Sequence, residues 1–232
     1  MPGKPSNGKL LYHTTLLTNI PSILEKGLLC RQKLSTSRTF FYDIADEKIL
    51  EERNKGDLSK YVPFHFFSTT PFEEGLVLRY GWENLAIVSI YRPNRADKMS
   101  RFKVIPSHPL SREMPKIMPY KEGMNSVRWD ILDDFATSYE DETQFDYSIP
   151  ANKTATMAEC LVEDKIEPRE IAWIFVRSKK VYDNLIDELE NKHPTTQRMW
   201  RKISHNWHMF PDVDDNIDSD EEEEYENIYY DE

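Results

Sequence analysis

The sequence predicts a mixed α+β fold, with one folded domain over residues 1–210 and an acidic tail over residues 211–232. At 232 residues, of which 39% are hydrophobic, the chain is long enough to bury one sizeable core. Strand-like and helix-like stretches are interleaved, yet they neither alternate as repeated strand-helix-strand units nor separate into two blocks. The sequence also contains no internal repeat, which argues against a solenoid.

The first expected element is a strand at residues 9–15, KLLYHTT, which is apolar and aromatic and ends in hydroxyl residues. A short helix should follow it directly. Thr18 or Asn19 can cap that helix, and Pro21 suits its first turn, while Gly27 suits its C-terminal end. The chain is therefore expected to open with a strand, a turn and a helix.

Four later stretches are rich in β-branched and aromatic residues, as strands of a core sheet are. They lie at residues 62–69, 85–91, 158–162 and 171–176. Only the turn EDKIEPRE separates the last two, so we expect those two strands to be neighbours in one sheet.

Four further stretches carry apolar residues at helical spacing. These expected helices lie at residues 45–53, 128–138, 181–191 and 197–207. Polar loops are expected around the first of them and at residues 139–156. In the segment 92–128, five prolines are expected to interrupt regular structure and to expose charge.

The net charge of -11 comes from the C-terminus. Twelve of the 41 acidic residues lie in 211–232, which has no Lys or Arg, so residues 1–210 hold 29 acidic and 30 basic residues. A tail with so few apolar residues per charge is expected to be disordered. Three roles remain open for it: a solubilising appendage, a nucleic-acid mimic that docks on the basic segment, or a contact for a neutralising partner.

The basic segment is residues 92–128, with nine Lys or Arg against three acidic residues. Ordinary surface charge explains such a segment, and so does a groove that follows a nucleic-acid strand. The sequence alone leaves both interpretations open.

Several function classes are disfavoured. No two of the seven glycines are spaced as in a dinucleotide-binding or P-loop motif, so a nucleotide would be held without a glycine-rich loop. Cys30 and Cys160 are too few for a disulfide scaffold or a four-cysteine zinc site, and we expect no metal. No apolar run approaches the roughly 20 residues of a membrane-spanning helix, and the N-terminus has no apolar signal region. We therefore expect a cytoplasmic protein.

Three residues are candidates for chemistry. Glu159 interrupts the apolar run MAECLV, and a carboxylate inside a strand is costly to bury unless it is paired or used. It could also point outward from an edge strand. His13 lies in a strand-like segment, and its residues alone favour an ordinary half-buried strand histidine over a functional one. Arg53, in EERN, is by itself typical of a solvated helix face.

Three blocks of sequence resemble the DarT family of DNA-directed ADP-ribosyltransferases, which are toxins of toxin-antitoxin systems. The blocks are LYHTTLLTNIPSILEKGLLC at 11–30, YVPFHFFSTTPF at 61–72 and MAECLVEDKIEPREI at 157–171, in the family's order. The resemblance spans about residues 9–177. The chain departs from the family pattern after VPF, where it has HFFSTTPF in place of an aromatic followed by Pro-Arg-Ser.

The resemblance implies an ADP-ribosyltransferase-type split β-sandwich with peripheral helices. Such a fold clamps NAD, the expected co-substrate, between its central strands without a glycine-rich loop. The family's essential glutamate falls on Glu159, and its functional arginine aligns best with Arg53, eight residues before Tyr61. The residues implied in NAD binding are His13, Thr14, Thr15, Ser22 and Arg53.

The implied acceptor is a base in single-stranded DNA, because a base inside a duplex cannot reach such a cleft. Basic residues are expected to follow the strand, and aromatic residues just before Glu159 are expected to stack on its bases. The candidates for these contacts are Arg95, Arg101, Lys103, Tyr139 and Tyr147.

Breaking the bond between nicotinamide and ribose develops positive charge on the ribose. Glu159 can stabilise that charge through a ribose hydroxyl and can also accept a proton from the attacking base. The implied function is that of a toxin or phage-defence effector, partnered by an antitoxin that removes ADP-ribose. Alternatives are the same chemistry on RNA, transfer to protein side chains, and a nucleic-acid-binding module without catalysis.

Overall fold

The computed structural model describes residues 4–37, 41–45, 47–109, 116–140, 145–146 and 148–210. The acidic tail at 211–232 and Tyr147 lie outside the described residues, so the expectations about them stay predictions. Within the described chain, no helix has both the length and the apolar character needed to cross a bilayer.

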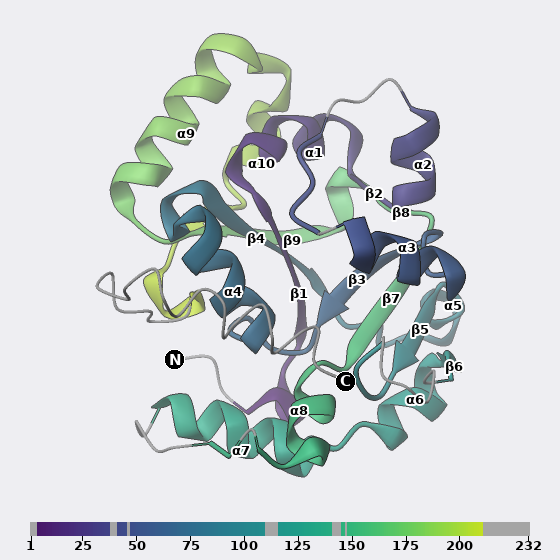
Figure 1. Ribbon diagram of the computed structural model, residues 1–232. Coiled ribbons are helices and arrows are strands. Elements are labelled where there is room, and N and C mark those ends of the chain that lie inside the picture. The colour runs from purple at the N-terminus through teal and green to yellow at the C-terminus, as the bar shows by residue number, and fades with distance from the viewer. Residues whose placement is uncertain are drawn as a thin grey trace.

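Eight strands form one sheet in the order β10-β9-β4-β1-β3-β7-β5-β6, and two short strands, β2 and β8, pair separately. The strands are β1 Leu10–Leu16, β2 Leu28–Leu29, β3 Tyr61–His65, β4 Leu85–Tyr91, β5 Phe102–Ile105, β6 Met118–Pro119, β7 Glu159–Glu163, β8 Lys165–Ile166, β9 Ile171–Val176 and β10 Ile203–His205. Figure 1 shows β1 in the middle of the molecule, with β3, β7, β5 and β6 to its right, while β4 and β9 cross it in this view.

The helices surround the sheet (Figure 1). They are α1 Ile20–Lys26, α2 Arg31–Thr36, α3 Glu47–Lys55, α4 Pro71–Tyr80, α5 Ala96–Met99, α6 Tyr120–Ser126, α7 Trp129–Glu140, α8 Pro150–Thr156, α9 Lys179–Lys192 and α10 Gln197–Trp200. The α+β class is therefore confirmed, as are the expected helices that correspond to α3, α7 and α9.

The sheet is divided between β1 and β3. Strand β1 pairs antiparallel with β4 along its whole length, whereas a single register pair in the described chain, Tyr12 with His65, joins β1 to β3. Beyond that pair the two halves of the sheet separate. The structure thus confirms the expected split sandwich.

The opening strand-turn-helix prediction is confirmed by β1 and α1. Gly27 ends the helix with a positive φ of 87°, and a Cβ atom there would come within 2.1 Å of the Ile166 carbonyl oxygen. Only glycine fits this turn without strain. Asn19 occupies the N-cap position, but its side chain does not cap the helix. That side chain is used elsewhere, at the candidate site.

The expectation that the two late strands are neighbours is wrong. β7 lies between β3 and β5, while β9 lies between β4 and β10 in the other half of the sheet. The intervening EDKIEPRE does not form a hairpin turn. Its first part forms β8, which pairs antiparallel with β2, and a 3-10 turn then leads the chain across to β9.

Three segments are more regular, or differently folded, than expected. The basic segment contains β5, which pairs with β7 through register pairs such as Ile105 with Glu159, and prolines flank its elements more than they interrupt them. The polar stretch 139–156 contains α8. The helix expected at 197–207 stops after α10, because Ile203 is buried opposite Ile174 in the parallel pair of β10 with β9.

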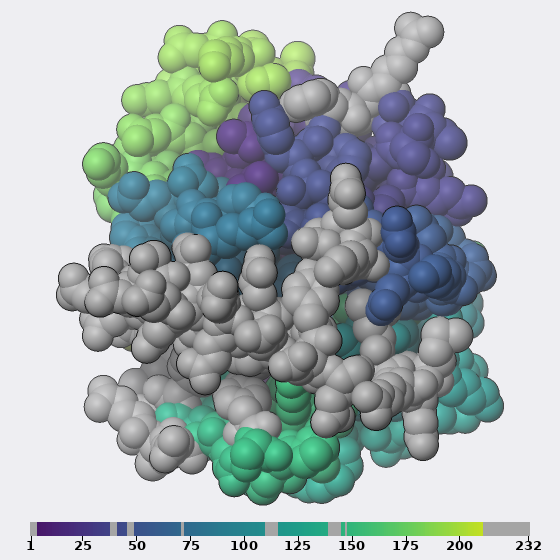
Figure 2. Space-filling model, in the orientation of Figure 1, coloured from purple at the N-terminus to yellow at the C-terminus, as the bar shows by residue number. Residues whose placement is uncertain are grey.

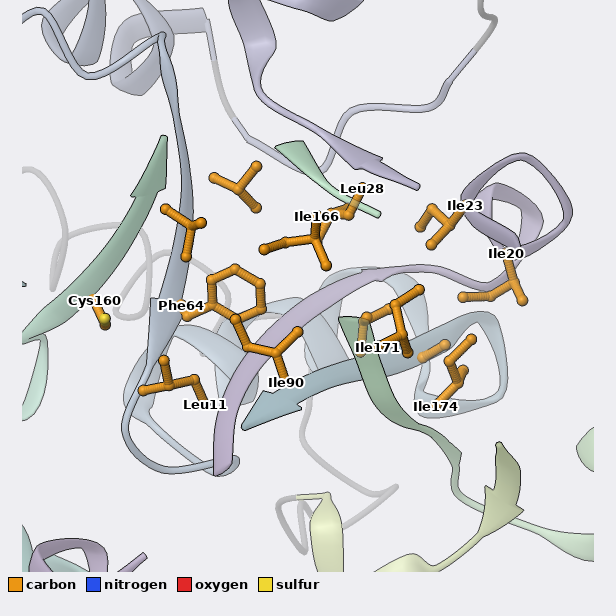
Figure 3. Close-up of a cluster of buried hydrophobic side chains, with 14 of the residues drawn as sticks. Leu11, Ile20, Ile23, Leu28, Phe64, Ile90, Cys160, Ile166, Ile171 and Ile174 are labelled. Carbon is orange, nitrogen blue, oxygen red and sulfur yellow. The ribbon is translucent and has the colours of Figure 1, made fainter. Parts of the chain in front are cut away.

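Alternation along the strands separates the core from the candidate site. On one face Phe64 and Cys160 are fully buried in the main core, together with Ile20 and Ile23 of α1 (Figure 3). The next residue along β3, His65, and the residue before Cys160 on β7, Glu159, point to the opposite face. The polar residues of β3 and β7 are therefore directed away from the main core.

Candidate active site

Glu159 and Arg53 form a buried ion pair. Glu159 is the first residue of β7, and Arg53 lies on α3. The Arg53 guanidinium donates from Nη1 to Oε1 at 2.8 Å and from Nη2 to Oε2 at 3.0 Å. Their side chains are only 15% and 6% exposed. This two-pronged geometry fixes the carboxylate in one orientation.

The electrostatics keep this carboxyl group ionised. Burial alone would raise the pKa of Glu159, but the charge and hydrogen bonds of Arg53, with smaller effects of His65 and His108, outweigh burial and hold the pKa below its usual value. Glu159 therefore presents a fixed negative charge at neutral pH.

His13 is held as a neutral imidazole. Its Nδ1 lies 2.8 Å from the Pro63 carbonyl oxygen, so Nδ1–H is the donor and Nε2 is left as an acceptor. The pKa of His13 is lowered to about 4, chiefly by burial and to a smaller extent by His65 and Arg53, while the Pro63 bond and the charge of Glu159 oppose the shift. The residue therefore offers a hydrogen-bond acceptor and no charge.

The hydroxyls of Thr14 and Thr15 already have partners within the protein. Thr14 Oγ1 donates to Glu73 Oε1 at 3.0 Å, and Thr15 Oγ1 accepts from Asn19 Nδ2 at 3.0 Å. Asn19 also donates to the Tyr42 carbonyl at 2.8 Å and accepts from the Tyr42 N–H at 2.9 Å. The Thr14 proton is therefore used within the protein, whereas Thr15 accepts a hydrogen bond and keeps its own O–H as a donor.

A second buried carboxylate lies behind Thr14. Glu73 forms a capping box with Thr70 at the start of α4, accepting from the Thr70 N–H at 3.0 Å and from its hydroxyl. Burial raises the pKa of Glu73, although His65 and the hydroxyl groups oppose this. Burial and the charge of Glu73 raise the pKa of the adjacent Glu74 to about 7.

These groups meet at a cavity of about 210 Å³ at the split between the halves of the sheet. Its walls come from β1, α1, α3, β3, β7 and the segment 41–45. His13, Ser22, Arg53 and Glu159 all line it. In the space-filling view, α3 and α4 lie on opposite sides of the face shown (Figure 2). Thr14 and Thr15 line the cavity as well, so the structure brings together all six of the catalytic and NAD-binding residues that the sequence analysis selected.

His65 was not among those residues, although it lines the same cavity. It ends β3 directly opposite Glu159 and is 7% exposed. The signal available in the sequence was a polar residue within the apolar run YVPFHFF. Glu73 was missed as well, although Thr70 and Glu73 have the spacing of a capping box.

The expected nucleic-acid contacts lie outside this cavity. Arg95 is exposed and pairs with Asp97, and Arg101 pairs with Glu170 at 2.9 Å. Lys103 of β5 is registered opposite Leu161, so it lies on the same sheet face as Glu159. Tyr139 belongs to α7, but its side chain and the whole of Tyr147 lie outside the described parts of the chain. The predicted contacts of these five residues with nucleic acid therefore stay predictions.

The described residues contain no group of three or more His, Cys, Asp or Glu side chains that could hold a metal ion. The charged groups of the cavity are the carboxylate of Glu159 held by Arg53 and the Arg31 guanidinium paired with Asp43, and the His13 imidazole beside them is neutral. Such a set can stabilise a developing positive charge and accept a proton.

A family model described as ssDNA thymidine ADP-ribosyltransferase, DarT, matches residues 12–210. The chain belongs to the DarT family. The match covers every element that lines the cavity and ends where the acidic tail begins. No curated protein sequence matches the chain.

Solved DarT structures share the fold. Thermosipho africanus DarTG, in complex with ADP-ribose, is 23% identical with a TM-score of 0.66, and the match covers 88% of this chain and 51% of that one. Thermus sp. 2.9 DarT in complex with ADP-ribosylated ssDNA is 18% identical with a TM-score of 0.66, over 87% and 96% of the two chains. The same DarT in complex with NAD+ is 15% identical, with a TM-score of 0.63, over 88% and 98%. This chain thus spans about half the length of the Thermosipho africanus DarTG chain.

Proposed function

We propose that the chain transfers ADP-ribose from NAD to a thymidine base in single-stranded DNA and releases nicotinamide. The observation that carries the proposal is the buried pair of Arg53 and Glu159, which faces the cavity at the split in the sheet. The description of the matched family supports thymidine as the acceptor. The Thermus sp. 2.9 complexes with NAD+ and with ADP-ribosylated ssDNA support the same two substrates.

The residues of the cavity suit NAD as a co-substrate. Arg31, paired with Asp43, and Arg53, paired with Glu159, supply two guanidinium groups, and Ser22 supplies a half-buried hydroxyl in the first turn of α1. Aromatic side chains such as Phe41 and Phe72 supply apolar wall. Phosphates, ribose hydroxyls and flat rings are the groups that such residues bind.

Glu159 is proposed to stabilise the reacting ribose. NAD supplies an ADP-ribosyl group whose bond to nicotinamide breaks with positive charge developing on the ribose. Each oxygen of Glu159 accepts one bond from Arg53 and retains a lone pair for a ribose hydroxyl. Arg53 is then a positioning residue that holds the carboxylate ionised and in place.

His13 and Ser22 are proposed to position the NAD. The Nε2 atom of His13 can accept a hydrogen bond from a ribose hydroxyl or the carboxamide, because Nδ1–H is fixed by Pro63. Ser22 can donate to a phosphate or ribose oxygen. Thr14 and Thr15 contribute by shaping this wall, since their hydroxyls bond to Glu73 and Asn19.

The biological setting is proposed from the family. A DNA-modifying toxin needs a partner that removes ADP-ribose, and the match to a protein named DarTG supports such an antitoxin. A role in phage defence and residence in the cytoplasm, where NAD and exposed DNA strands occur, complete the proposal.

The test incubates the purified chain with NAD in three separate reactions. One contains thymidine-containing single-stranded DNA, one contains the same strands lacking thymidine, and one contains RNA of matched sequence. Products are identified by mass and nicotinamide release is measured. We expect ADP-ribose on the thymidine-containing DNA alone. Labelling of RNA alone would show that the acceptor is RNA and not DNA. If no adduct forms and NAD is left intact, the enzymatic function is rejected in favour of a binding module.

A further inference from the structure

A second ion pair lies in the wall of the cavity. Arg31 is the first residue of α2, and Asp43 lies in the segment 41–45. The Arg31 guanidinium donates from Nη1 to Oδ2 of Asp43 and from Nη2 to Oδ1, the latter at 2.9 Å. Both residues line the cavity, and their side chains are 30% and 27% exposed. A ligand in the cavity can therefore reach this pair.

Both members of the pair are ionised at neutral pH. Burial would raise the pKa of Asp43, but the hydrogen bonds from Arg31 and from the Ala45 N–H, together with the charge of Arg31, hold the pKa below its usual value. An arginine side chain stays protonated at any ordinary pH. The Asp43 carboxylate therefore neutralises the Arg31 guanidinium.

The diphosphate of NAD needs a cationic partner in the cavity. Among the described residues of the cavity wall, the arginines and lysines are Arg31 and Arg53, and each is already paired with a carboxylate. The two pairs together carry no net charge. A diphosphate brings two negative charges, which are costly to place in a partly buried site without a partner. Binding of NAD is thus expected to redirect one of the two guanidinium groups.

Arg31 is the guanidinium that can be redirected. Its pair with Asp43 is partly open to water, and ion pairs of this kind are weak. The side chains of Arg53 and Glu159 are only 15% and 6% exposed, and breaking their pair would leave a buried charge uncompensated. The proposed chemistry also needs that pair intact, because Arg53 holds the carboxylate that faces the ribose.

The segment around Asp43 has other attachments besides Arg31. Asp43 Oδ1 also accepts from the Ala45 N–H at 3.0 Å, and Asn19 bonds to both backbone groups of Tyr42. These bonds remain when Arg31 turns away. The fork of a guanidinium fits two phosphate oxygens as it fits two carboxylate oxygens, so the exchange preserves two hydrogen bonds to Arg31.

We propose that Asp43 holds Arg31 in place of a phosphate, and that Arg31 moves from Asp43 to the diphosphate when NAD binds. This proposal rests on the proposed function and adds a competing anion to its binding site. Asp43 then limits the affinity for NAD, because the diphosphate must displace this carboxylate from Arg31 and afterwards lies near it without a cation between them.

The test measures the affinity of the full chain for carba-NAD by calorimetry. This analogue keeps the diphosphate but has a carbocycle in place of the reacting ribose, so it is not turned over. Asp43→Asn removes the negative charge and keeps an oxygen for the Ala45 N–H. We expect it to bind carba-NAD about 3–10-fold more tightly than the wild type. Asp43→Ser, a second neutral residue that suits this turn, should show the same gain.

The opposite replacement removes the cation. Arg31→Gln loses the charged hydrogen bonds to the diphosphate, so we expect it to bind carba-NAD about 10–100-fold more weakly than the wild type. An affinity equal to that of the wild type would overturn the assignment of Arg31 to the diphosphate.

Two replacements at a neighbouring ion pair are the matched controls. Lys33 of α2 pairs with Asp164 at 2.7 Å, and neither is among the described residues of the cavity wall. Asp164→Asn and Lys33→Gln change the net charge as the test variants do, and asparagine tolerates the φ of 75° at residue 164. Both should keep an affinity for carba-NAD within about twofold of the wild type.

Salt dependence separates competition from a change in the shape of the wall. In the wild type Arg31 exchanges one anion for another on binding, whereas in Asp43→Asn the unpaired guanidinium gains an anion. The affinity of Asp43→Asn should therefore fall more steeply with salt than that of the wild type. Weaker or unchanged binding by both Asp43 variants, or the same salt dependence as the wild type, would overturn the role of Asp43 alone. A wild type that binds no carba-NAD would instead overturn the proposed function, and this role with it.

Discussion

Arg53 donates to both carboxylate oxygens of Glu159, although 106 residues of sequence separate them. α3 and β7 meet only because β3, which follows α3 in the chain, pairs antiparallel with β7. The ion pair therefore depends on long-range strand pairing. It places a fixed negative charge at the split where the halves of the sheet separate, so that the cavity presents a carboxylate to a bound ribose.

Replacing Glu159 by Gln should remove transfer without unfolding the protein. A neutral amide cannot stabilise a positive ribose as a carboxylate does, so we expect a loss of about 10³-fold in the rate of nicotinamide release and DNA labelling. Leaving Arg53 partly unpaired should cost about 1–3 kcal/mol of unfolding free energy. Glu163→Gln, at the exposed end of the same strand, is the control. Comparable activity of the two variants would reject Glu159 as the charge-stabilising group.

Replacing Arg53 by Lys tests whether catalysis depends on the two-bond geometry of the pair with Glu159 or only on the positive charge. Lysine keeps the positive charge but offers a single point contact, so the carboxylate is no longer fixed by two parallel bonds. We expect kcat to fall by roughly 10²-fold with a smaller change in KM, because misplacement of a catalytic group acts on the chemical step. Arg198→Lys, an exposed replacement on α10, should have no effect. Full activity of Arg53→Lys would show that the second bond is dispensable.

Asn19 is expected to hold the wall of the cavity in place. Its side chain makes three hydrogen bonds, one to Thr15 and two to the backbone of Tyr42. We expect Asn19→Ala to lower the unfolding free energy by about 1–3 kcal/mol and to weaken NAD binding measured by calorimetry. Asn84→Ala removes an exposed side-chain bond to Tyr80 and serves as control. Unchanged NAD affinity would separate Asn19 from the site.

Glu74 should make the protein less stable as the pH rises. Its folded-state pKa of about 7 lies above the ordinary value of 4.5, so the folded state binds more protons between these limits. Stability linked to Glu74 is therefore full below pH 4.5 and is lost as the pH rises through 7. Glu74→Gln should raise the unfolding free energy at pH 8 by roughly 1–3 kcal/mol and change it little at pH 4.5. Denaturant titration at both pH values, with Glu83→Gln as control, measures this; equal effects at the two pH values would contradict it.

Local patterns predicted most elements of the fold but not their order in the sheet. The residues around Glu159 predict a strand by themselves, whereas the place of this strand between β3 and β5 depends on pairing with segments about 100 and about 55 residues earlier in the chain. The expectation that residues 158–162 and 171–176 are neighbouring strands was wrong for the same reason, since the intervening β8 pairs with the distant β2.

The candidate site shows the same limit. Glu159 was suggested by its position in an apolar strand, but the resemblance to the family was needed to select Arg53 from an ordinary charged helix. His65 and Glu73 could not be selected from the sequence, because their partners are distant in the chain. His65 lies opposite Glu159 in the pair of β3 with β7, and Glu73 accepts a hydrogen bond from Thr14. Likewise, nothing local to Thr14 indicates that its hydroxyl is already bonded.

The basic residues expected to bind DNA should contribute unequally. Arg95 and Arg101 are each paired with a carboxylate, while Lys103 has no ion-pair partner within the described chain and lies on the same sheet face as Glu159. A cation that is already paired must give up that partner to contact a phosphate, so Lys103→Gln should weaken binding to single-stranded DNA more than Arg95→Gln does.

Salt dependence gives the quantitative form of this prediction. Each lost phosphate contact reduces the slope of log affinity against log salt by about 0.7 for a single strand. We expect the triple variant Arg95→Gln, Arg101→Gln, Lys103→Gln to flatten the slope by roughly 1–2, with Lys103 responsible for most of it. Fluorescence anisotropy with a labelled thymidine-containing strand measures the slope, and a matched triple replacement of Lys179, Lys180 and Lys192 on α9 controls for net charge. If both triple variants flatten the slope equally, the basic segment acts only through overall charge and is not a path for the strand.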